Sequence, residues 1–212
     1  MARTSTSSTG PFASSRAAVE KVALELFAER GFDDTPVEDI AAAAGISRRT
    51  FFRYFPTKGD VLFGDFGILL QAIEDWFTAV PEDAPLFEVI AEATMRFNRF
   101  HTDGPVAHRE RMELILHTPA LRANATLRHA EWLAVIARYA ARRMGLPEDA
   151  LAAQLAGHLS IGAANAAYEQ WLRDESSDLA ELVHRAFGLI ESLPEMVTPK
   201  SRTRRRRPII AS

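Results

Sequence analysis

The stretch DDTPVEDIAAAAGISRRTFFRYFPTK, residues 33–58, decides the fold. Thr35–Glu38 has the pattern of a capping box, with proline at the first helical position, where its missing N–H costs nothing. Gly45 is expected to end this helix and Ser47 to cap the next one. Between these limits the apolar residues form one helical stripe, namely Val37, Ile40, Ala41 and Ala44. The pattern predicts a helix-turn-helix, whose second helix usually reads the major groove of DNA.

At about 100° per residue, the second helix divides into an inward and an outward face. Phe51 and Phe55 are expected in the core, with Arg49 and Arg53 on the opposite side. Arginine can pair with guanine, hydroxyl groups suit phosphate oxygens, and threonine or phenylalanine can touch a thymine methyl. The alternative is a solvated basic helix, which the ordered run of cap, glycine turn and arginine face disfavours. We therefore predict DNA contacts from Thr35, Ser47, Arg48, Arg49, Thr50, Phe52, Arg53, Tyr54 and Lys58.

These motifs resemble the DNA-binding domain of the tetracycline-repressor (TetR) family. The resemblance extends over residues 16–66 and rests on ALELFAERGFDDTPVEDIAAAAGIS, followed by RRTFFRYFPTKGDV. It implies an all-α fold of about nine helices, in which three helices form the DNA-binding domain and the others a larger ligand-binding and dimerisation domain. It also implies a repressor that a ligand releases from DNA.

The resemblance assigns roles to single residues. It implies phosphate contacts for Thr50, Tyr54 and Lys58, and base contacts for Arg48 and Arg49. Lys58 is also expected beside the start of a further helix, where charge and helix N-terminus would together attract phosphate. Many family members have tyrosine at the position of Phe52, so an apolar contact is expected there instead of a phosphate hydrogen bond.

A narrower resemblance concerns the ligand. The run TFFRYFPTK, followed by Gly64, Asp65 and Phe66, is similar to regulators of acyl-CoA-like ligands, including those of the mycofactocin system. An acyl chain needs an apolar tunnel, and the phosphates of CoA need arginines near its mouth. Candidates for the phosphate contacts are Arg96, Arg99, Arg109 and Arg111, although a solvated helix face also explains each of them.

Composition is compatible with a helical regulator. The chain has 212 residues, of which 47% are hydrophobic, and it has no cysteine, which excludes disulfides and thiolate metal sites. No apolar run approaches the roughly 18 residues that span a membrane. The polar start, MARTSTSSTGPFASS, is not a secretory signal, so we expect a cytoplasmic protein without membrane association.

Four segments are expected along the chain. Residues 1–14 form a disordered arm, 15–60 the helix-turn-helix domain, 61–196 the helical ligand-binding and dimerisation domain, and 197–212 a disordered basic tail. The tail carries six cationic residues and no acid, which favours an auxiliary contact with nucleic acid through counterion release. Contact with an acidic membrane surface and a merely solvated end are the alternatives.

The remaining helices follow from caps, prolines and apolar periodicity. The helix at 147–174 is rich in alanine and glycine, and the helix at 178–193 has a wide apolar face. The two could form a four-helix interface with a second copy, as the resemblance implies, or only complete the core of the monomer. The expected helices are 15–30, 57–79, 86–101, 106–117, 119–143, 147–174 and 178–193, in addition to the helix-turn-helix.

A ligand pocket is expected among the helices after the DNA-binding domain, lined by apolar groups and a few polar ones. For any single aromatic residue, ordinary core packing is the alternative. Trp171 and His117 are further candidates beside the main set. That set is Phe63, Phe66, Phe97, Phe100, Arg111, Met112, Leu116, Trp132, Ile136, Asn165 and Tyr168.

An enzyme is not expected. GHLSIG at 157–162 differs in spacing from a nucleophile elbow and lies in a helical context, and His108-Arg109-Glu110 lacks the paired cysteines of a zinc deaminase. The six histidines show no metal-ligand spacing, so neither a metal nor a cofactor is predicted.

Two functions are compatible with these patterns. The first is a dimeric DNA-binding regulator, a repressor released from its operator by a small apolar or acyl-CoA-like ligand. The alternative is a DNA-binding regulator without small-molecule input that a protein partner controls. Operator DNA and a second copy of the chain are the partners expected in the first case.

Overall fold

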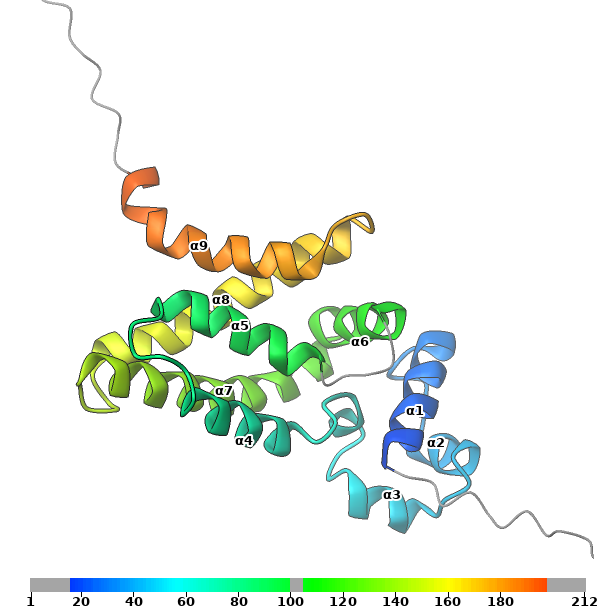
Figure 1. Ribbon diagram of the computed structural model, residues 1–212. Helices are drawn as coiled ribbons and strands as arrows, with labels where there is room; N and C mark the ends of the chain where they lie inside the picture. The colour runs from blue at the N-terminus through cyan, green and yellow to red at the C-terminus, as the bar shows by residue number, and fades with distance from the viewer. Residues whose placement is uncertain (1–15, 100–104, 198–212) are drawn as a thin grey trace, which may run out of the picture.

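The computed structural model describes residues 16–99 and 105–197, and within them it is all-helical (Figure 1). The N-terminal helices are α1 (Arg16–Arg30), α2 (Val37–Ala43) and α3 (Arg48–Tyr54), followed by the short 3-10 helix η1 (Gly59–Leu62). The larger part contains α4 (Phe66–Phe77), α5 (Leu86–Arg99), α6 (Pro105–His117), α7 (Pro119–Met144), α8 (Leu151–Arg173) and α9 (Leu179–Val197). This confirms the predicted fold class. No helix of the described residues is long and apolar enough to cross a lipid bilayer.

The helix-turn-helix forms as the sequence predicts. Gly45 has a φ of 67°, a left-handed conformation that glycine adopts without strain, and it follows Ala44, the C-cap of α2. The Oγ of Ser47 accepts a hydrogen bond from the backbone N–H of Thr50 at 3.1 Å and thereby caps α3. Phe51 and Phe55 are fully buried, with ring centroids 5.2 Å apart, so the inward face of α3 is confirmed.

Three local predictions are wrong. Thr35 does not cap α2, since its hydroxyl donates to the carbonyls of Leu26 and Gly31 at 3.4 and 2.7 Å, and α2 begins at Val37 without a side-chain cap. The helix expected from residue 57 is interrupted, because Asp60 accepts hydrogen bonds from Thr57 and stabilises a tight turn in its place. Residues 147–149 likewise form a turn before α8, not its first turn.

The C-terminal part is built around α7 and α8, which pack side by side over much of their length, with α5 and α9 against them (Figure 1). Gly157 shows why α8 is rich in small residues. A Cβ placed there would lie 3.0 Å from the carbonyl oxygen of Leu133 on α7, so only glycine permits this approach. Gly157 therefore serves the packing of α8 against α7 within one monomer.

The two parts of the chain meet through η1 and α6. In Figure 1, η1 lies between the three N-terminal helices and the α4–α7 layer, and contacts link it to both α1 and α7. A Cβ on Gly59 would lie 2.7 Å from the side-chain amide of Asn124 on α7, so η1 and α7 are in close contact. Through η1, α7 is therefore in contact with the N-terminal helices.

Candidate DNA-binding surface and ligand pocket

The outward face of α3 carries its basic residues into solvent. Arg49 and Arg53 are exposed, as the helical periodicity predicts, and 38% of the surface of Phe52 is exposed although its neighbour Phe51 is fully buried. The Arg53 guanidinium lies 5.3 Å from the ring centroid of Tyr54. This surface offers charge, an aromatic ring and hydroxyl groups in one place, which are the groups that contact DNA bases and phosphates.

Arg48 is held by neighbours on the same surface. Its Nε lies 2.7 Å from Oε1 of Glu38 on α2, and its guanidinium lies 5.0 Å from the centroid of the Phe52 ring. Both members of the ion pair are exposed, and such pairs contribute only about 0–1 kcal/mol. Arg48 can therefore exchange Glu38 for a DNA group at little cost.

Ser47 and Thr50 share the N-terminal end of α3. Their hydroxyl oxygens are 3.0 Å apart, and the Ser47 hydroxyl already accepts the capping hydrogen bond from the Thr50 backbone. Ser47 is exposed and Thr50 half-buried, so both lie at the edge of the surface defined by Arg49 and Arg53. The structure brings these predicted DNA contacts together, and their role remains a prediction.

Lys58 has a structural partner that the sequence did not reveal. Its Nζ donates to the carbonyl oxygens of Phe32 and Thr35 at 2.7 and 3.1 Å, and lies 4.1 Å from the centroid of the Phe32 ring. The ammonium therefore closes the loop between α1 and α2. Lys58 is half-buried. Its ammonium has three N–H donors, so one remains for a phosphate contact beside the two hydrogen bonds to the carbonyls.

Thr35, also predicted to contact DNA, is fully buried. Its hydroxyl donates into the end of α1, where Gly31 turns the chain with a φ of 83°. The structure therefore corrects its placement, because a side chain inside the domain offers no surface to a duplex.

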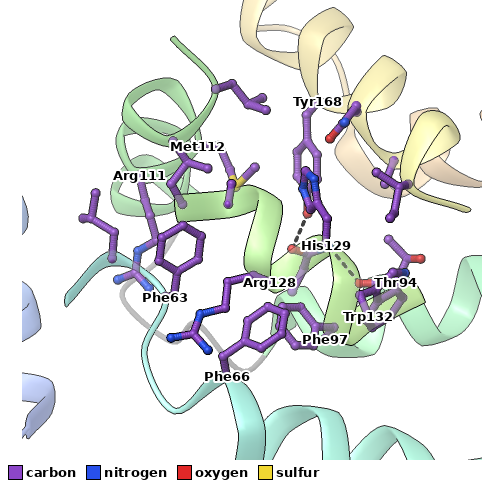
Figure 2. Close-up of a pocket in the computed structure, with 18 of the residues that line it drawn as sticks. Phe63, Phe66, Thr94, Phe97, Arg111, Met112, Arg128, His129, Trp132 and Tyr168 are labelled. Carbon is purple, nitrogen blue, oxygen red and sulfur yellow. Dashed lines mark hydrogen bonds between the residues drawn. The ribbon is translucent and has the colours of Figure 1, made fainter. Parts of the chain in front are cut away.

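A cavity of about 120 Å³ lies between η1 and helices α4 to α8 (Figure 2). Its wall is mostly apolar and aromatic, and it begins at the segment that follows the helix-turn-helix. The lining residues are Leu62, Phe63, Phe66, Thr94, Phe97, Asn98, His108, Arg111, Met112, Ile115, Leu116, Ala125, Arg128, His129, Trp132, Ile161, Ala164, Asn165 and Tyr168.

Most of the predicted pocket residues lie in this wall. Ile136 does not, because it is fully buried in the core away from the cavity, and Phe100 lies outside the described residues. Trp171 and His117 also lie elsewhere. The predicted residues that line the cavity are Phe63, Phe66, Phe97, Arg111, Met112, Leu116, Trp132, Asn165 and Tyr168.

Neutral polar groups occupy the side of the cavity formed by α5 and α8. The Tyr168 hydroxyl is hydrogen-bonded to Oδ1 of Asn98, and burial raises the pKa of Tyr168 so that the phenol stays protonated. The Asn98 amide in turn donates to the carbonyl of Thr94 at 2.7 Å. Burial lowers the pKa of His129, which therefore lines the cavity as neutral imidazole at pH 7.

Arg128 is the charged pocket residue that the sequence analysis missed. Its Nη2 donates to Oδ1 of Asp60 on η1 at 3.0 Å, and its guanidinium lies 5.5 Å from the ring centroid of Phe66. The side chain of Asp60 is 7% exposed and that of Arg128 is 25% exposed. Burial raises the pKa of Asp60, but hydrogen bonds from Thr57, Arg128 and Asn124 outweigh it, so the net pKa is lowered.

A sequence signal for Arg128 exists. The buried positions of α7 recur at alternating intervals of four and three residues, and Arg128 is the charged residue within that apolar stripe. A charge at a core-facing position is a candidate for function. The stripe is Leu121, Ala125, Arg128, Trp132, Val135 and Tyr139.

Arg111 on α6 connects the cavity to α1. It is only 3% exposed, and its charge acts on Glu20, a half-buried residue of α1. Burial raises the pKa of Glu20, and the nearby charges of Arg111 and Arg16 oppose this rise without cancelling it. Arg128 thus pairs with a carboxylate of the N-terminal part of the chain, and Arg111 interacts electrostatically with another.

The other arginines considered for CoA phosphates do not line the cavity. The guanidinium of Arg96 lies 4.5 Å from the Trp76 ring centroid, and that of Arg109 lies 4.2 Å from the Trp171 ring centroid. The side chain of Arg99 lies outside the described residues. Among the described residues, no three histidine, aspartate or glutamate side chains gather in a way that could hold a metal ion.

Comparisons with known proteins agree with this architecture. Residues 21–63 match the family described as bacterial regulatory proteins, tetR family, and residues 84–193 match the MftR C-terminal domain. MftR of Mycobacterium tuberculosis, named for the regulation of mycofactocin biosynthesis, is 40% identical over 172 residues, which cover 81% of this chain and 87% of that protein.

Two solved structures share the fold. FadR from Bacillus subtilis, in complex with stearoyl-CoA, has a TM-score of 0.59 at 21% identity and covers 81% of this chain and 95% of its own. FadR from Thermus thermophilus, a TetR-family repressor in complex with lauroyl-CoA, has a TM-score of 0.53 at 22% identity and covers 93% of this chain and 100% of its own.

The helix-turn-helix and the exposed basic face of α3 define the class as DNA-binding transcriptional regulators. The chain belongs to the TetR family, with a C-terminal domain of the MftR type. The resemblance seen in the sequence is thereby confirmed, whereas the boundary predicted at residues 60 and 61 remains a prediction.

Proposed function

We propose that this protein is a homodimeric repressor that a small apolar or acyl-CoA-like ligand releases from operator DNA. The observation that carries the proposal is an apolar cavity whose wall includes Leu62 of η1 and Phe63 and Phe66 directly after it. A ligand placed there would lie a few residues from α3 along the chain. Such a protein acts on DNA in the cytoplasm as a regulator and not as an enzyme.

Two observations support an acyl ligand. The cavity wall is dominated by apolar and aromatic side chains, and two proteins that share the fold are described with stearoyl-CoA and lauroyl-CoA. At about 120 Å³ the cavity is smaller than the roughly 300–1,000 Å³ typical of ligand pockets. A long acyl chain would therefore require the surrounding helices to move apart.

That requirement gives a mechanism for release. A ligand that binds the widened conformation more tightly shifts the population toward it, by no more than its difference in affinity for the two states. Widening moves η1 or α7, which are in close contact at Gly59. The two helix-turn-helix units of the dimer would then no longer fit half-sites about 34–36 Å apart.

We further propose that α3 reads the operator. Arg48 and Arg49 would contact base edges, Thr50, Tyr54 and Lys58 phosphates, and Phe52 an apolar group such as a thymine methyl. Ser47 and Arg53 flank this set on the same surface. All of these residues except Lys58 lie on α3 or its cap.

The dimer would form through α8 and α9. Leu151 and Leu155 on α8 are 84% and 52% exposed, and Leu189 on α9 is 41% exposed. Gly162 lies on the same exposed side of α8 and has open space around it, which permits close approach of a second helix. A Leu155→Glu variant should then sediment as a monomer in analytical ultracentrifugation, whereas Glu175→Gln, at an exposed residue after α8, should not change the mass.

The test of the proposed function is a fluorescence-anisotropy titration of DNA from the region upstream of the protein's own coding sequence. Addition of lauroyl-CoA should release the DNA, and CoA alone should not. Tight, sequence-selective binding that acyl-CoA, fatty acid and fatty alcohol all leave unchanged would instead support control by a protein partner. Absence of selective DNA binding would overturn both functions.

A further inference from the structure

The charges in the cavity wall have one sign. The described residues that line it include Arg111 and Arg128 but no aspartate or glutamate, and His129 is neutral at pH 7. A buried guanidinium requires a counter-ion or hydrogen-bond acceptors, because desolvation of a lone charge is costly. An anionic group entering the cavity would therefore meet favourable partners, and a cationic group would not.

The carboxylates beside these arginines belong to the other part of the chain. Asp60, which pairs with Arg128 at 3.0 Å, lies on η1, and Glu20, on which Arg111 acts, lies on α1. Figure 2 shows the guanidinium groups of Arg111 and Arg128 on one side of the cluster, beside Phe63 and Phe66, with Tyr168 toward the opposite end. The cavity thus has a cationic end, and the rest of its wall is mostly apolar and aromatic.

We propose that the pocket takes an anionic amphiphile, an apolar chain with a carboxylate or phosphate group, and that this anionic group replaces Asp60 as the partner of Arg128. The inference rests on the proposed function, because it takes the cavity to be the effector site. The apolar chain would lie along the aromatic wall that includes Phe97 and Trp132. Arginine pairs well with either anionic group, since its planar donors match both.

Replacement of Asp60 weakens the link between the cavity and the DNA-binding helix. Asp60 also accepts hydrogen bonds from the backbone N–H and the hydroxyl of Thr57, at 2.8 and 2.9 Å, and Thr57 follows α3 after two intervening residues. Without Arg128, the hydrogen bond from Asn124 at 3.3 Å is the remaining polar contact from α7 to Asp60. The turn after α3 is then free to shift while its internal hydrogen bonds persist.

The first test compares decanoate with 1-decanol, which differ in charge and share the chain length. Calorimetric titration of the full-length wild-type protein should give about tenfold tighter binding of decanoate, the factor that 1.4 kcal/mol represents. Arg128→Gln should abolish this preference. Arg122→Gln, at an exposed position of the same helix outside the cavity, should retain it. Equal binding of acid and alcohol to the wild type, together with equal binding of decanoyl-CoA to the wild type and to Arg128→Gln, would overturn the inference.

Two further ligands identify the source of the anion. If decanoate loses affinity in Arg128→Gln, the recognised group is a carboxylate. If only decanoyl-CoA loses affinity there, and CoA alone does not bind, the recognised group is a phosphate of an acyl-CoA. If decanoate keeps its preference over decanol in Arg128→Gln and decanoyl-CoA also keeps its affinity, Arg128 does not hold the anion.

The second test removes the internal competitor. Asp60→Asn should bind decanoate about tenfold more tightly than the wild type does, because Arg128 loses its carboxylate partner. Its DNA affinity should respond less to decanoate. Asp34→Asn, at an exposed position, is the matched control and should change neither value. If Asp60→Asn does not fold, the comparison of decanoate, decanol and decanoyl-CoA in the wild type and Arg128→Gln still decides the question.

Failure of this inference differs from failure of the proposed function. If decanol releases operator DNA as well as decanoate does, the ligand-responsive repressor stands and the exchange of partners at Arg128 is wrong. If the protein binds DNA but binds no acyl-CoA, fatty acid or fatty alcohol, the proposed small-molecule control is wrong. The exchange of partners at Arg128 is then wrong as well.

Discussion

Arg49 and Arg53 on α3 extend into solvent, whereas Arg111 and Arg128 of the pocket are largely withdrawn from it and lie near carboxylates from another part of the chain. Water already stabilises the charges on α3, so they can exchange solvent for DNA without disturbing the fold. The pocket arginines depend on their protein partners, since water reaches them poorly. Under the proposed function, charge at the surface would serve recognition of DNA, whereas charge at the pocket pairs side chains from two parts of the molecule.

The largest difference between the two sets should appear in stability. Arg128→Ala leaves Asp60 without its cationic partner, and the free energy of unfolding should fall by about 3 kcal/mol, the lower end for a broken buried pair because Arg128 is a quarter exposed. Urea denaturation measures this loss. Arg122→Ala on the same helix should stay within about 0.5 kcal/mol of the wild type, as exposed substitutions do. Equal losses of stability in the two variants would show that the pair of Arg128 with Asp60 contributes no more than an exposed arginine does.

The opposite result is expected on α3. Arg49→Ala should leave the unfolding free energy almost unchanged and weaken operator binding by about 1–3 kcal/mol, the value of a good base contact. Its affinity for random DNA should change much less. The measurement is a pair of anisotropy titrations with operator and scrambled duplexes. An equal loss on both duplexes would place Arg49 on the phosphate backbone and not on a base.

Lys58 lies between these two cases, because it is half-buried and donates to two backbone carbonyls. Lys58→Ala should lower the free energy of unfolding by about 1.5 kcal/mol through the lost charged hydrogen bonds. It should also weaken binding to operator and random DNA alike. If DNA binding falls while stability does not, the contacts with Phe32 and Thr35 contribute little and the phosphate contact dominates.

The smallest effect concerns His117, which is exposed and lies between Glu113 on α6 and Glu169 on α8. The hydrogen bond that His117 donates to Glu113 is the main cause that raises the pKa of His117 above 6.5. A raised folded-state pKa adds stability below the unfolded-state pKa, and this stability is lost as pH rises through the folded-state pKa. The wild type should therefore exceed His117→Gln in melting temperature at pH 6, and by less at pH 8. A constant difference would exclude this linkage.

The sequence predictions were accurate where the deciding interactions join residues that are close in the sequence. The end of α2 at Gly45, the cap at Ser47 and the inward faces of Phe51 and Phe55 follow from neighbouring residues and are confirmed. The predicted cap at Thr35 was wrong, because its hydroxyl donates to the carbonyls of Leu26 in α1 and of Gly31 just after it, up to nine positions away.

The pocket was predictable in composition but not in detail. Apolar periodicity identified most of its aromatic residues, yet the same pattern also selected Ile136, which packs in the core. Core positions and cavity positions share one helical spacing, so the sequence does not separate them. Arg128 broke the apolar stripe of α7 and could have been recognised for that reason.

The sequence by itself determined the helical class, the helix-turn-helix and the surface that α3 offers to DNA, because periodicity, caps and glycine conformation act within a few residues. Only the tertiary structure decided that Arg128 meets Asp60, 68 positions away, and that Lys58 closes the loop before α2. Long-range pairs of this kind depend on how helices pack, and packing brings together groups that no local pattern connects.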